Sequence, residues 1–489
     1  MSSFAKIARG SLVLTAGKIA AHGCSFIRNV ILARLLTKAD FGIAATFAIT
    51  IDLFELASKM AINRLIVQAK EGDQPSFQAV AHFMQFLLGL VTGVFLFLLA
   101  GPLAALFRVP EALWAFRTLA LIPCLRGCMH LDVNRMERTM RFGPVVAIDF
   151  VPQVAIALCA WPLAVWLGDY RSLLFLLLAR WLLAVGTSHL LAQRAYRWGW
   201  DTAHLKHVLA FGWPLLMNGF VMLTIFQGDR FIVGARYSMA DLAVYSVAGS
   251  LVLLPADVLG HVLSAVSLPL FSAAQDSPKT FGDRYVLCWQ LTTPIAAAFA
   301  TSCMLAGQLL ISLFYGKKYE GAGILFGWMA ITEGLRLLRL APTVAAMARG
   351  DTRSLLFANL SRTLGPCLAV VAAVAGADLT LIAVSGLAGE GLAFLTSIVL
   401  VAKRHSLSPR VAYRPIAVAA TLTLLAGMAV AAGVPHAGWP TVLSVTLGFL
   451  LLSCIVPLLL FPHLRRHVCL AAGHLLHGRR SSPLDETGM

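Results

Sequence analysis

The chain consists of long apolar runs separated by short polar segments. A transmembrane helix needs about 20 consecutive, mostly apolar residues, and fourteen stretches meet that requirement. The connections between them are short, so we predict a helix for each run. The predicted spans are 11–34, 41–66, 78–105, 112–133, 144–167, 172–193, 207–234, 241–270, 285–314, 322–347, 355–375, 379–402, 414–433 and 440–462.

Composition indicates that these helices lie in a membrane. Of 489 residues, 59% are hydrophobic and only 13% are charged, and the mean hydropathy is +0.80. A soluble domain is about 25% charged and about 45–50% apolar, so this chain has too little polar surface to cover a globule in water. A soluble enzyme and a disordered chain are both excluded. We predict an all-α polytopic membrane protein with about 14 transmembrane helices.

The basic residues predict its orientation. The net charge is +16, and a cytoplasmic N-terminus would place 21 Lys and Arg residues in cytoplasmic segments. The external segments would then hold six, which are Lys38, Arg108, Arg171, Arg236, Lys317 and Lys318. Because Lys and Arg are retained on the cytoplasmic side, both termini are predicted to be cytoplasmic. The basic residues are explained as topology signals, so no nucleic-acid partner is expected.

An internal repeat divides the chain. Ala33-Arg34 and Ala39-Asp40 follow the first span, and Ala235-Arg236 and Ala240-Asp241 follow the seventh. Each Asp is expected to be the N-cap of the next helix, and the six intervening spans give both copies the same orientation. We predict two pseudo-symmetric six-helix lobes plus two C-terminal helices: an N-lobe at 1–193, a cytoplasmic loop at 194–206, a C-lobe at 207–402, helices 13 and 14 at 403–462, and a cytoplasmic tail at 463–489.

Charged residues inside the spans mark the candidate site. A charge at mid-bilayer costs about 2.5–3.5 kcal/mol, so such residues tend to face a wet cavity or a charged partner. We interpret them as lining a hydrophilic cavity of net positive charge, with Asp149 as an acid in the same half of the chain. The candidate substrate-binding cations are Lys18, Arg28, Arg126 and Arg180.

Four further residues are candidates for ion coupling. Asp52 and Glu55 share one face of the second span, and Asp257 and His261 are four residues apart on the eighth. Histidine titrates near neutral pH, which suits proton coupling. The structural alternatives are a self-satisfied ion network around Asp52 and Glu55, and a helix-packing hydrogen bond between Asp257 and His261.

Other patterns point to packing rather than chemistry. Gly89-x-x-x-Gly93 is a helix-packing motif, and Glu333 with Arg336 is most simply an intrahelical pair. The chain has no nucleotide-binding, dinucleotide-binding or metalloprotease motif and no Cys-x-x-Cys pair. We therefore expect no cofactor and no metal, and transport rather than enzymatic activity.

Several segments, in this order along the chain, resemble the polysaccharide repeat-unit flippases of O-antigen and exopolysaccharide synthesis, which belong to the multidrug/oligosaccharidyl-lipid/polysaccharide (MOP) exporter superfamily. The resemblance covers about residues 5–400, and Tyr319 stands where the family often has Trp. The segments are 31–42, which contains Asp40 and Gly42; 228–234, which contains Asp229 and Arg230; and 243–245, 268–272 and 314–321.

This resemblance implies a function. The substrate would be an undecaprenyl-diphosphate-linked oligosaccharide, turned by alternating access from the cytoplasmic to the periplasmic leaflet of the bacterial inner membrane. The implied partners are membrane lipids, a polysaccharide polymerase and chain-length proteins. Arginine matches a diphosphate bidentately, so Arg28, with Arg126 or Arg180, is expected to contact the diphosphate or acidic sugars.

Four alternatives remain open at this stage. A lipid II flippase of the same superfamily also has fourteen helices. A multidrug/cation antiporter usually has twelve spans, and an arginine-rich cavity suits an anion better than a cationic drug. A membrane-integral enzyme of envelope assembly would favour a sizeable external loop, which this chain lacks. A non-transporting assembly partner would tolerate mutation of every intramembrane charge.

Overall fold

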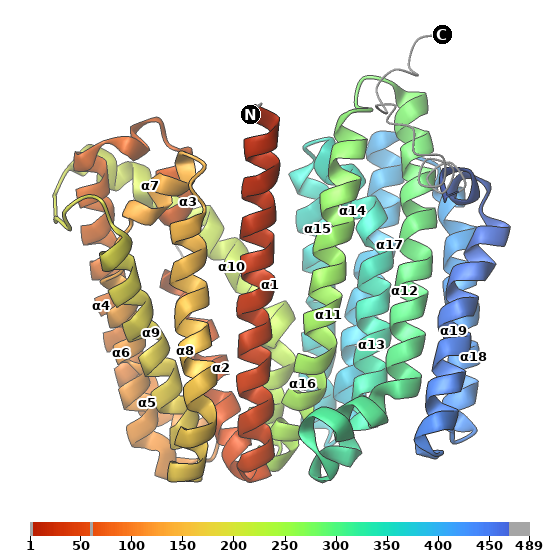
Figure 1. The fold of residues 1–489 in the computed structure, drawn as a ribbon, viewed down its shortest axis with the longest axis horizontal. Coiled ribbons are helices and arrows are strands. Elements are labelled where there is room, and N and C mark those ends of the chain that lie inside the picture. The colour runs from red at the N-terminus through yellow and green to blue at the C-terminus, as the bar shows by residue number, and fades with distance from the viewer. Residues whose placement is uncertain (1–2, 59–61, 469–489) are drawn as a thin grey trace. The chain divides into compact units, whose positions relative to one another are not determined.

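A computed structural model describes residues 3–58 and 62–468, and every regular element in these ranges is a helix (Figure 1). Side chains are described throughout these ranges except at 3–12, 55–58, 203–204 and 206–218. Each predicted span coincides with one helix or with a succession of shorter helices. The all-α class predicted from the sequence is confirmed.

The first seven predicted spans fold as ten α-helices. The fourth span is divided among α5, α6 and α7. Of the second span the structure describes α2 and α3, on either side of residues 59–61. The bounds are α1 Ser3–Leu35, α2 Lys38–Ser58, α3 Ile62–Gln68, α4 Pro75–Leu106, α5 Leu113–Leu119, α6 Leu121–Gly127, α7 Asp132–Arg138, α8 Gly143–Leu167, α9 Arg171–Leu191 and α10 Thr202–Arg236.

The last seven spans fold as nine α-helices. Short 3-10 turns join several of them: η3 Lys317–Ala322, η4 Pro409–Ala412 and η5 Val434–His436. The α-helices are α11 Met239–Ser272, α12 Pro278–Tyr315, α13 Gly323–Leu338, α14 Leu340–Ala348, α15 Thr352–Arg362, α16 Leu364–Val374, α17 Leu379–His405, α18 Tyr413–Ala431 and α19 Trp439–Leu460.

Many of these helices are suited to cross a membrane. Within the described ranges, nine helices or continuous helical stretches are long and apolar enough, and a tenth is added if Pro110–Gly127 and Asp132–Arg138, bent by 51°, form one span. The helices α1 and α2 are outside that set, and they contain Lys18, Arg28 and Asp52. The predicted count of fourteen is compatible with this result, because polar spans fail a test based on hydropathy.

The chain packs as two compact units. Unit 1 comprises residues 1–250, 312–322 and 366–382, and unit 2 comprises residues 251–311, 323–365 and 383–489. In unit 1, α1 packs on α8, α8 on α9, and α4 on α5 and α6. In unit 2, α14 packs on α15 and α18 on α19.

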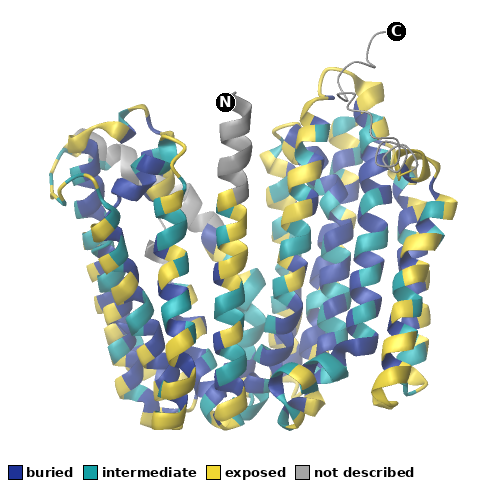
Figure 2. Cartoon of the chain, viewed as in Figure 1, coloured by how far each residue is buried: buried dark blue, intermediate teal, exposed yellow. Residues whose placement is uncertain are grey.

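Burial follows the expectation for helices surrounded by lipid. Figure 2 shows helices with buried and exposed faces in both units. Large apolar side chains are exposed on these outer faces; Leu158 is 73% exposed, Trp166 79% and Leu98 68%. Lipid covers apolar surface at no cost, so these side chains need no protein partner.

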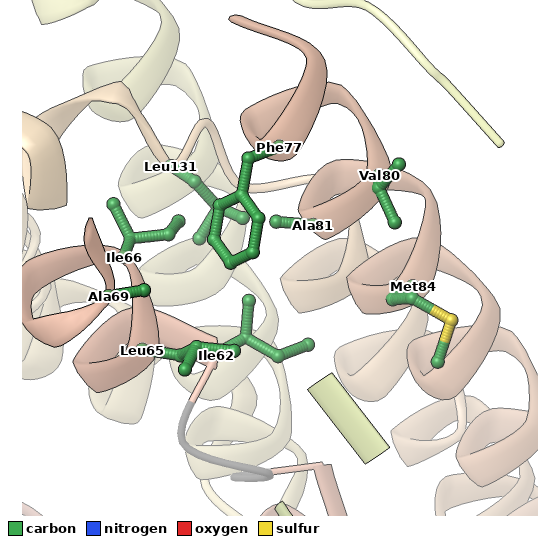
Figure 3. Close-up of a cluster of buried hydrophobic side chains, with 9 residues drawn as sticks. All are labelled: Ile62, Leu65, Ile66, Ala69, Phe77, Val80, Ala81, Met84 and Leu131. Carbon is green, nitrogen blue, oxygen red and sulfur yellow. The ribbon is translucent and has the colours of Figure 1, made fainter. Parts of the chain in front are cut away.

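The interior of unit 1 includes a cluster where α3, the start of α4 and the residue before α7 meet. Figure 3 shows Phe77 of α4 among side chains from α3 and Leu131. This cluster fixes the short helix α3, whose seven residues could not be stable alone in water. The members are Ile62, Leu65, Ile66, Ala69, Phe77, Val80, Ala81, Met84 and Leu131.

Candidate functional site

Unit 1 contains a cavity of about 690 Å³. Its polar lining comes from several helices that are distant in the sequence, including α1, α3, α6 and α8. The charged residues that line it are Lys18, Arg64, Arg126 and Asp149. Three cations and one acid therefore face the same space. Two of the four predicted substrate-binding cations, Lys18 and Arg126, lie in this lining.

Asp149 of α8 is the carboxylate around which the cations gather. Its charged neighbours are Arg180 of α9, Lys18 and His22 of α1, and Arg126 of α6. Since α1 packs on α8 and α8 packs on α9, three helices bring these groups together. One carboxylate cannot balance three permanent cations, so the cluster is left with a net positive charge.

Trp181 holds two of these cations next to each other. The guanidinium carbon of Arg126 lies 5.1 Å from the centre of the Trp181 ring, and that of Arg180 lies 5.0 Å from it. Both distances are within the cation–π range of about 6 Å. Trp181 is only 8% exposed, and its Nε1 has no hydrogen-bond partner among the described residues. The indole therefore offsets part of the repulsion between two adjacent arginines.

Arg28 extends the positive region along α1. Its side chain is 7% exposed, and it donates to Asn29 Oδ1 at 3.0 Å and to Ser25 Oγ at 3.1 Å. Arg180 is its charged neighbour, so two predicted cations lie near each other here as well. Arg28 Nη1 is buried and has no hydrogen-bond acceptor among the described residues. A buried guanidinium with a spare donor is suited to an anionic ligand.

Close helix packing places Arg126 at the cavity. A Cβ at Gly89 would lie 2.5 Å from the carbonyl oxygen of Pro123, and one at Gly93 would lie 2.5 Å from Cys124 Sγ. Only glycine allows α4 to approach α6 this closely, so the predicted Gly-x-x-x-Gly packing motif is confirmed. Gln85 Nε2 then donates to the carbonyl of Arg126 at 3.1 Å, which fixes the end of α6.

The ion-coupling candidates are divided between the two units, with Asp52 and Glu55 in unit 1 and Asp257 and His261 in unit 2. In unit 1, Gln227 Nε2 donates to Asp52 Oδ2 at 2.5 Å, while the side chain of Glu55 lies outside the described residues. In unit 2, His261 Nδ1 lies 2.8 Å from the backbone carbonyl oxygen of Asp257 rather than from its carboxylate. The Asp257 carboxylate pairs with Arg336 Nη2 at 3.5 Å.

An ion network in unit 2 includes Asp257, whose side chain is 53% exposed. Glu333 Oε2 pairs with Arg336 Nη1 at 3.0 Å, which is the intrahelical pair predicted from the sequence. Glu390 of α17 accepts from Arg339 Nε at 2.5 Å and pairs with Arg362 Nε at 2.8 Å. Three arginines and three acids balance one another. Unlike the cluster in unit 1, this network has no excess charge to attract an anion.

The segment with Asp40 and Gly42 has a structural role, and the prediction that Asp40 is the N-cap of its helix is wrong. The N-cap of α2 is Thr37, whose Oγ1 accepts from the backbone N–H of Asp40 at 3.1 Å. Asp40 lies inside the first turn and accepts from the Thr37 hydroxyl at 2.5 Å. Ser238 and Asp241 repeat this reciprocal arrangement at the start of α11. Each Asp is therefore the third-position partner in a capping box, not the cap itself.

The two repeats meet at these helix starts. A Cβ at Gly42 would lie 1.8 Å from the carbonyl oxygen of Met239, so only glycine fits there. Residues 314–321 pack against the same segment: Arg34 Nε donates to the carbonyl of Phe314 at 2.6 Å, and Lys318 Nζ donates to that of Leu36 at 2.6 Å. Two of the segments that carry the family resemblance, 31–42 and 314–321, thus pack against each other.

Asp229 and Arg230 also have structural contacts. Asp229 Oδ2 accepts from the hydroxyl of Tyr245 at 2.7 Å. The Arg230 guanidinium lies against Gly249, where a Cβ would come within 2.7 Å of its Nη2. These contacts join α10 to the first turns of α11, so neither residue needs a ligand to explain its presence in the membrane.

Sequence reasoning missed Trp181 and assigned no role to Asp149. Trp181 is the one tryptophan of the apolar run 172–193, and its composition alone does not distinguish a buried indole from an exposed one such as Trp166 in the preceding run. The available signal was its position directly after Arg180. Asp149 was visible as an acid within a span, but its basic neighbours come from three other helices.

Taken together, the cavity can bind an anion. Guanidinium groups offer paired N–H donors to phosphate or carboxylate oxygens, and polar side chains such as Gln85 and Asn134 line the same space. Within the described ranges, no group of three or more His, Cys, Asp or Glu side chains could hold a metal ion.

Curated relatives come from exopolysaccharide synthesis. The succinoglycan biosynthesis transport protein ExoT of Rhizobium meliloti (strain 1021) is 20% identical over 318 residues, which is 65% of this chain and 64% of the relative. The chain thus matches slightly less than two thirds of that relative's length. The amylovoran biosynthesis protein AmsL of Erwinia amylovora is 21% identical over 303 residues, covering 60% of this chain and 75% of the relative.

Solved structures share the fold at low identity. The lipid II flippase MurJ, in an inward closed conformation, superposes with a TM-score of 0.69 at 12% identity, covering 96% of this chain and 100% of MurJ. An inward-facing multidrug resistance MATE family transporter of the MOP superfamily gives 0.63 at 14%, covering 78% and 94%. The family model for polysaccharide biosynthesis protein matches residues 31–323, more than half of the chain. This chain therefore belongs to the polysaccharide biosynthesis protein family and has the fold of the MOP superfamily, as the sequence resemblance predicted.

Proposed function

We propose that this protein moves an undecaprenyl-diphosphate-linked oligosaccharide repeat unit from the cytoplasmic to the periplasmic leaflet. The observation that carries the proposal is the cavity in unit 1, whose lining includes Lys18, Arg64, Arg126 and Asp149. Arg180 is a further charged neighbour of Asp149. The names of both relatives, one of which is called a transport protein, support a role in polysaccharide synthesis.

The chemistry of the headgroup explains why such a cavity is needed. A diphosphate and its sugars carry charges and hydroxyl groups whose unaided passage through hydrocarbon would be prohibitively costly. Arg126 and Arg180, adjacent on Trp181, offer two guanidinium forks to neighbouring phosphate oxygens. Arg28 adds a buried donor without a protein acceptor among the described residues. The polar lining offers hydrogen bonds to sugar hydroxyls.

We further propose a mechanism, a membrane and an orientation for this protein. The protein works by alternating access in the bacterial inner membrane, with both termini in the cytoplasm, and it delivers its cargo to a polysaccharide polymerase and chain-length proteins. The excess of basic residues in the predicted cytoplasmic segments supports this orientation. The protein acts as a carrier rather than as an enzyme.

Ion coupling through acids forms a second part of the proposal. Asp52 is exposed and bound to Gln227, so its carboxylate is accessible to a proton or a sodium ion. Glu55 is the second candidate on α2. Asp257 and His261 are the candidates in unit 2, although the pairing of Asp257 with Arg336 limits its role. Unchanged flipping after the ion gradient is collapsed would exclude coupling through any of these residues.

Depletion of the protein, followed by mass spectrometry of lipid-linked intermediates, tests the identity of the cargo. We expect one undecaprenyl-diphosphate oligosaccharide to accumulate, and its mass would give the repeat unit. Accumulation of lipid II instead would move the assignment to a peptidoglycan-precursor flippase. An unchanged lipid-linked pool would overturn the flippase proposal and favour a drug antiporter.

An Arg28→Ala variant tests the assignment of the site. We expect export to fall at least about tenfold at normal expression, because a charge-assisted hydrogen bond contributes about 1.5–3 kcal/mol. Arg171→Ala is the matched control, since Arg171 pairs at the surface with Asp169. Full export by the Arg28 variant would remove Arg28 from the site.

A further inference from the structure

A second pocket lies in unit 2, outside the cavity described above. Its volume is about 340 Å³, and it is formed by α12, by η4 with the start of α18, and by the end of α19. The lining combines basic groups, namely Arg410, Arg414 and His463, with an apolar portion that includes Val286 and Leu460. The charge distribution in the sequence predicts that this end of the helices faces the cytoplasm.

The pocket lies in a part of the chain that has no acids. No Asp or Glu occurs between Glu390 and Asp485, and no acidic residue lines the pocket. The single acid of α12, Asp283, is also outside the lining. Among the described residues, neither Arg410 nor Arg414 has an ion-pair partner. Within residues 3–58 and 62–468, the positive charge of this pocket is therefore not compensated by an ion pair.

The basic residues at the end of α17, in contrast to those of the pocket, are paired with an acid. Arg404 Nη1 pairs with Asp351 Oδ1 at 2.8 Å, and His405 Nε2 lies 3.0 Å from Asp351 Oδ2. Burial and the nearby cations Arg284 and Arg466 lower the pKa of His467, which follows α19. His467 also lies near His463 of the lining, so the basic groups after α19 add to the positive charge at the pocket.

Polar groups at the pocket are ordered by the protein. Gln290 of α12 is 7% exposed and belongs to the lining. Its Oε1 accepts from the backbone N–H of Leu464 at 2.9 Å, which ties the segment after α19 to α12. Tyr413, by contrast, is 75% exposed at the start of α18, as expected for an aromatic ring at a membrane surface.

We propose that this pocket binds the phosphate headgroup of an anionic phospholipid of the cytoplasmic leaflet. The forked donors of Arg410 and Arg414 match phosphate oxygens, and Gln290 and Tyr413 add neutral hydrogen-bonding groups. The apolar lining of Val286 and Leu460 suits the glycerol and upper acyl region. Basic pockets between transmembrane helices on the cytoplasmic side are suited to anionic lipid headgroups.

The lipid is assigned as a resident phospholipid rather than as the cargo. The pocket belongs to the C-terminal helices of unit 2, and it shares no lining residue with the cavity of unit 1. Bulk anionic phospholipid is also always present at this depth of the membrane. The inference does not depend on the proposed transport function, because lipid binding and flipping are measured separately.

Native mass spectrometry of the purified full-length protein tests this proposal. The probes are phosphatidylglycerol and phosphatidylethanolamine with identical acyl chains, which differ in net headgroup charge. We expect wild type to retain phosphatidylglycerol about tenfold better than phosphatidylethanolamine. An Arg410→Gln/Arg414→Gln variant should lose that preference, since each basic residue contributes about a fivefold change in affinity near an anionic surface.

An Arg353→Gln/Lys403→Gln variant is the matched control. It removes the same charge from exposed positions at the same end of unit 2 and outside the pocket, and it should keep the preference for phosphatidylglycerol.

Equal retention of phosphatidylglycerol by the pocket variant and wild type, or no preference in wild type, would overturn the proposal. Displacement of phosphatidylglycerol by undecaprenyl phosphate at a lower concentration would assign the pocket to the cargo lipid and also overturn it. If the double variant does not fold, the two single substitutions are each expected to weaken retention.

Discussion

At the scale of single residues, the site in unit 1 depends on one carboxylate among several cations. Asp149 lies among Lys18, Arg126 and Arg180, and it competes with any anionic ligand for the same donors. The sequence could identify these groups as costly intramembrane charges. It could not show that they meet, because Arg126 and Arg180 are far apart in the chain and share Asp149 and Trp181 as neighbours only in the folded structure.

An Asp149→Asn substitution should therefore strengthen anion binding. We expect inorganic diphosphate to bind the purified protein about three- to tenfold more tightly, because the competing negative charge is removed at short range. Isothermal titration calorimetry measures this directly. Asp169→Asn, at a surface pair with Arg171, should leave the affinity unchanged. Unchanged or weaker binding by Asp149→Asn would separate Asp149 from the anion site.

A second residue, Asp351, links stability to pH outside the membrane-spanning segments. Burial alone would raise the pKa of its carboxyl, but hydrogen bonds from Ser354 and the charge of Arg404 outweigh it and hold the pKa well below its usual value. A depressed pKa in the folded state gives stability that is present above the unfolded value, near 3.8, and is lost as the pH falls through the folded pKa.

An Asp351→Asn variant isolates this charge, because Asn also caps helices well. We expect its melting temperature to lie below that of wild type at pH 5, and the difference to shrink as the pH falls from 4 to 3. Asp378→Asn is the control, since Asp378 also accepts a backbone N–H at a helix start but has no ion pair among the described residues. A difference that is constant down to pH 3 would contradict the assignment.

At the scale of helices, hydropathy predicted where each span lies along the chain. It did not predict where a span is broken into shorter helices. The fourth span is divided into α5, α6 and α7. Capping was also misread: the pattern around Asp40 marks a helix start, but the hydroxyl of Thr37 makes the cap. A capping box contains two candidate residues, and sequence alone did not distinguish their roles.

Gly42 provides a test of the contact between the starts of α2 and α11. Gly42→Ala should destabilise the protein by about 1–3 kcal/mol or prevent its folding, because the new Cβ would overlap the Met239 carbonyl oxygen. Gly23→Ala is the matched control in α1, where a Cβ meets nothing within 4 Å, and it should be neutral or stabilising. Thermal melting in detergent measures both. Equal melting temperatures for the two variants would contradict the close approach.

At the scale of the whole molecule, the two units differ in how they treat buried charge. Unit 2 balances three arginines against three acids, while unit 1 leaves its cavity positive. The sequence predicted the fold, the family and the presence of these charges. It could not predict which set of charges is neutralised, because pairing depends on contacts between helices, such as that between Arg362 of α15 and Glu390 of α17, which no periodicity reveals.

Flipping in reconstituted proteoliposomes tests the central claim most directly. The substrate is the lipid-linked oligosaccharide that accumulates on depletion, and the readout is its accessibility to a glycosidase added outside. Wild type and an Arg171→Gln/Arg236→Gln control should flip it at equal rates, whereas Arg126→Gln/Arg180→Gln should be at least about tenfold slower at the same protein level. Equal rates for the cavity variant, or no flipping by wild type, would contradict the account.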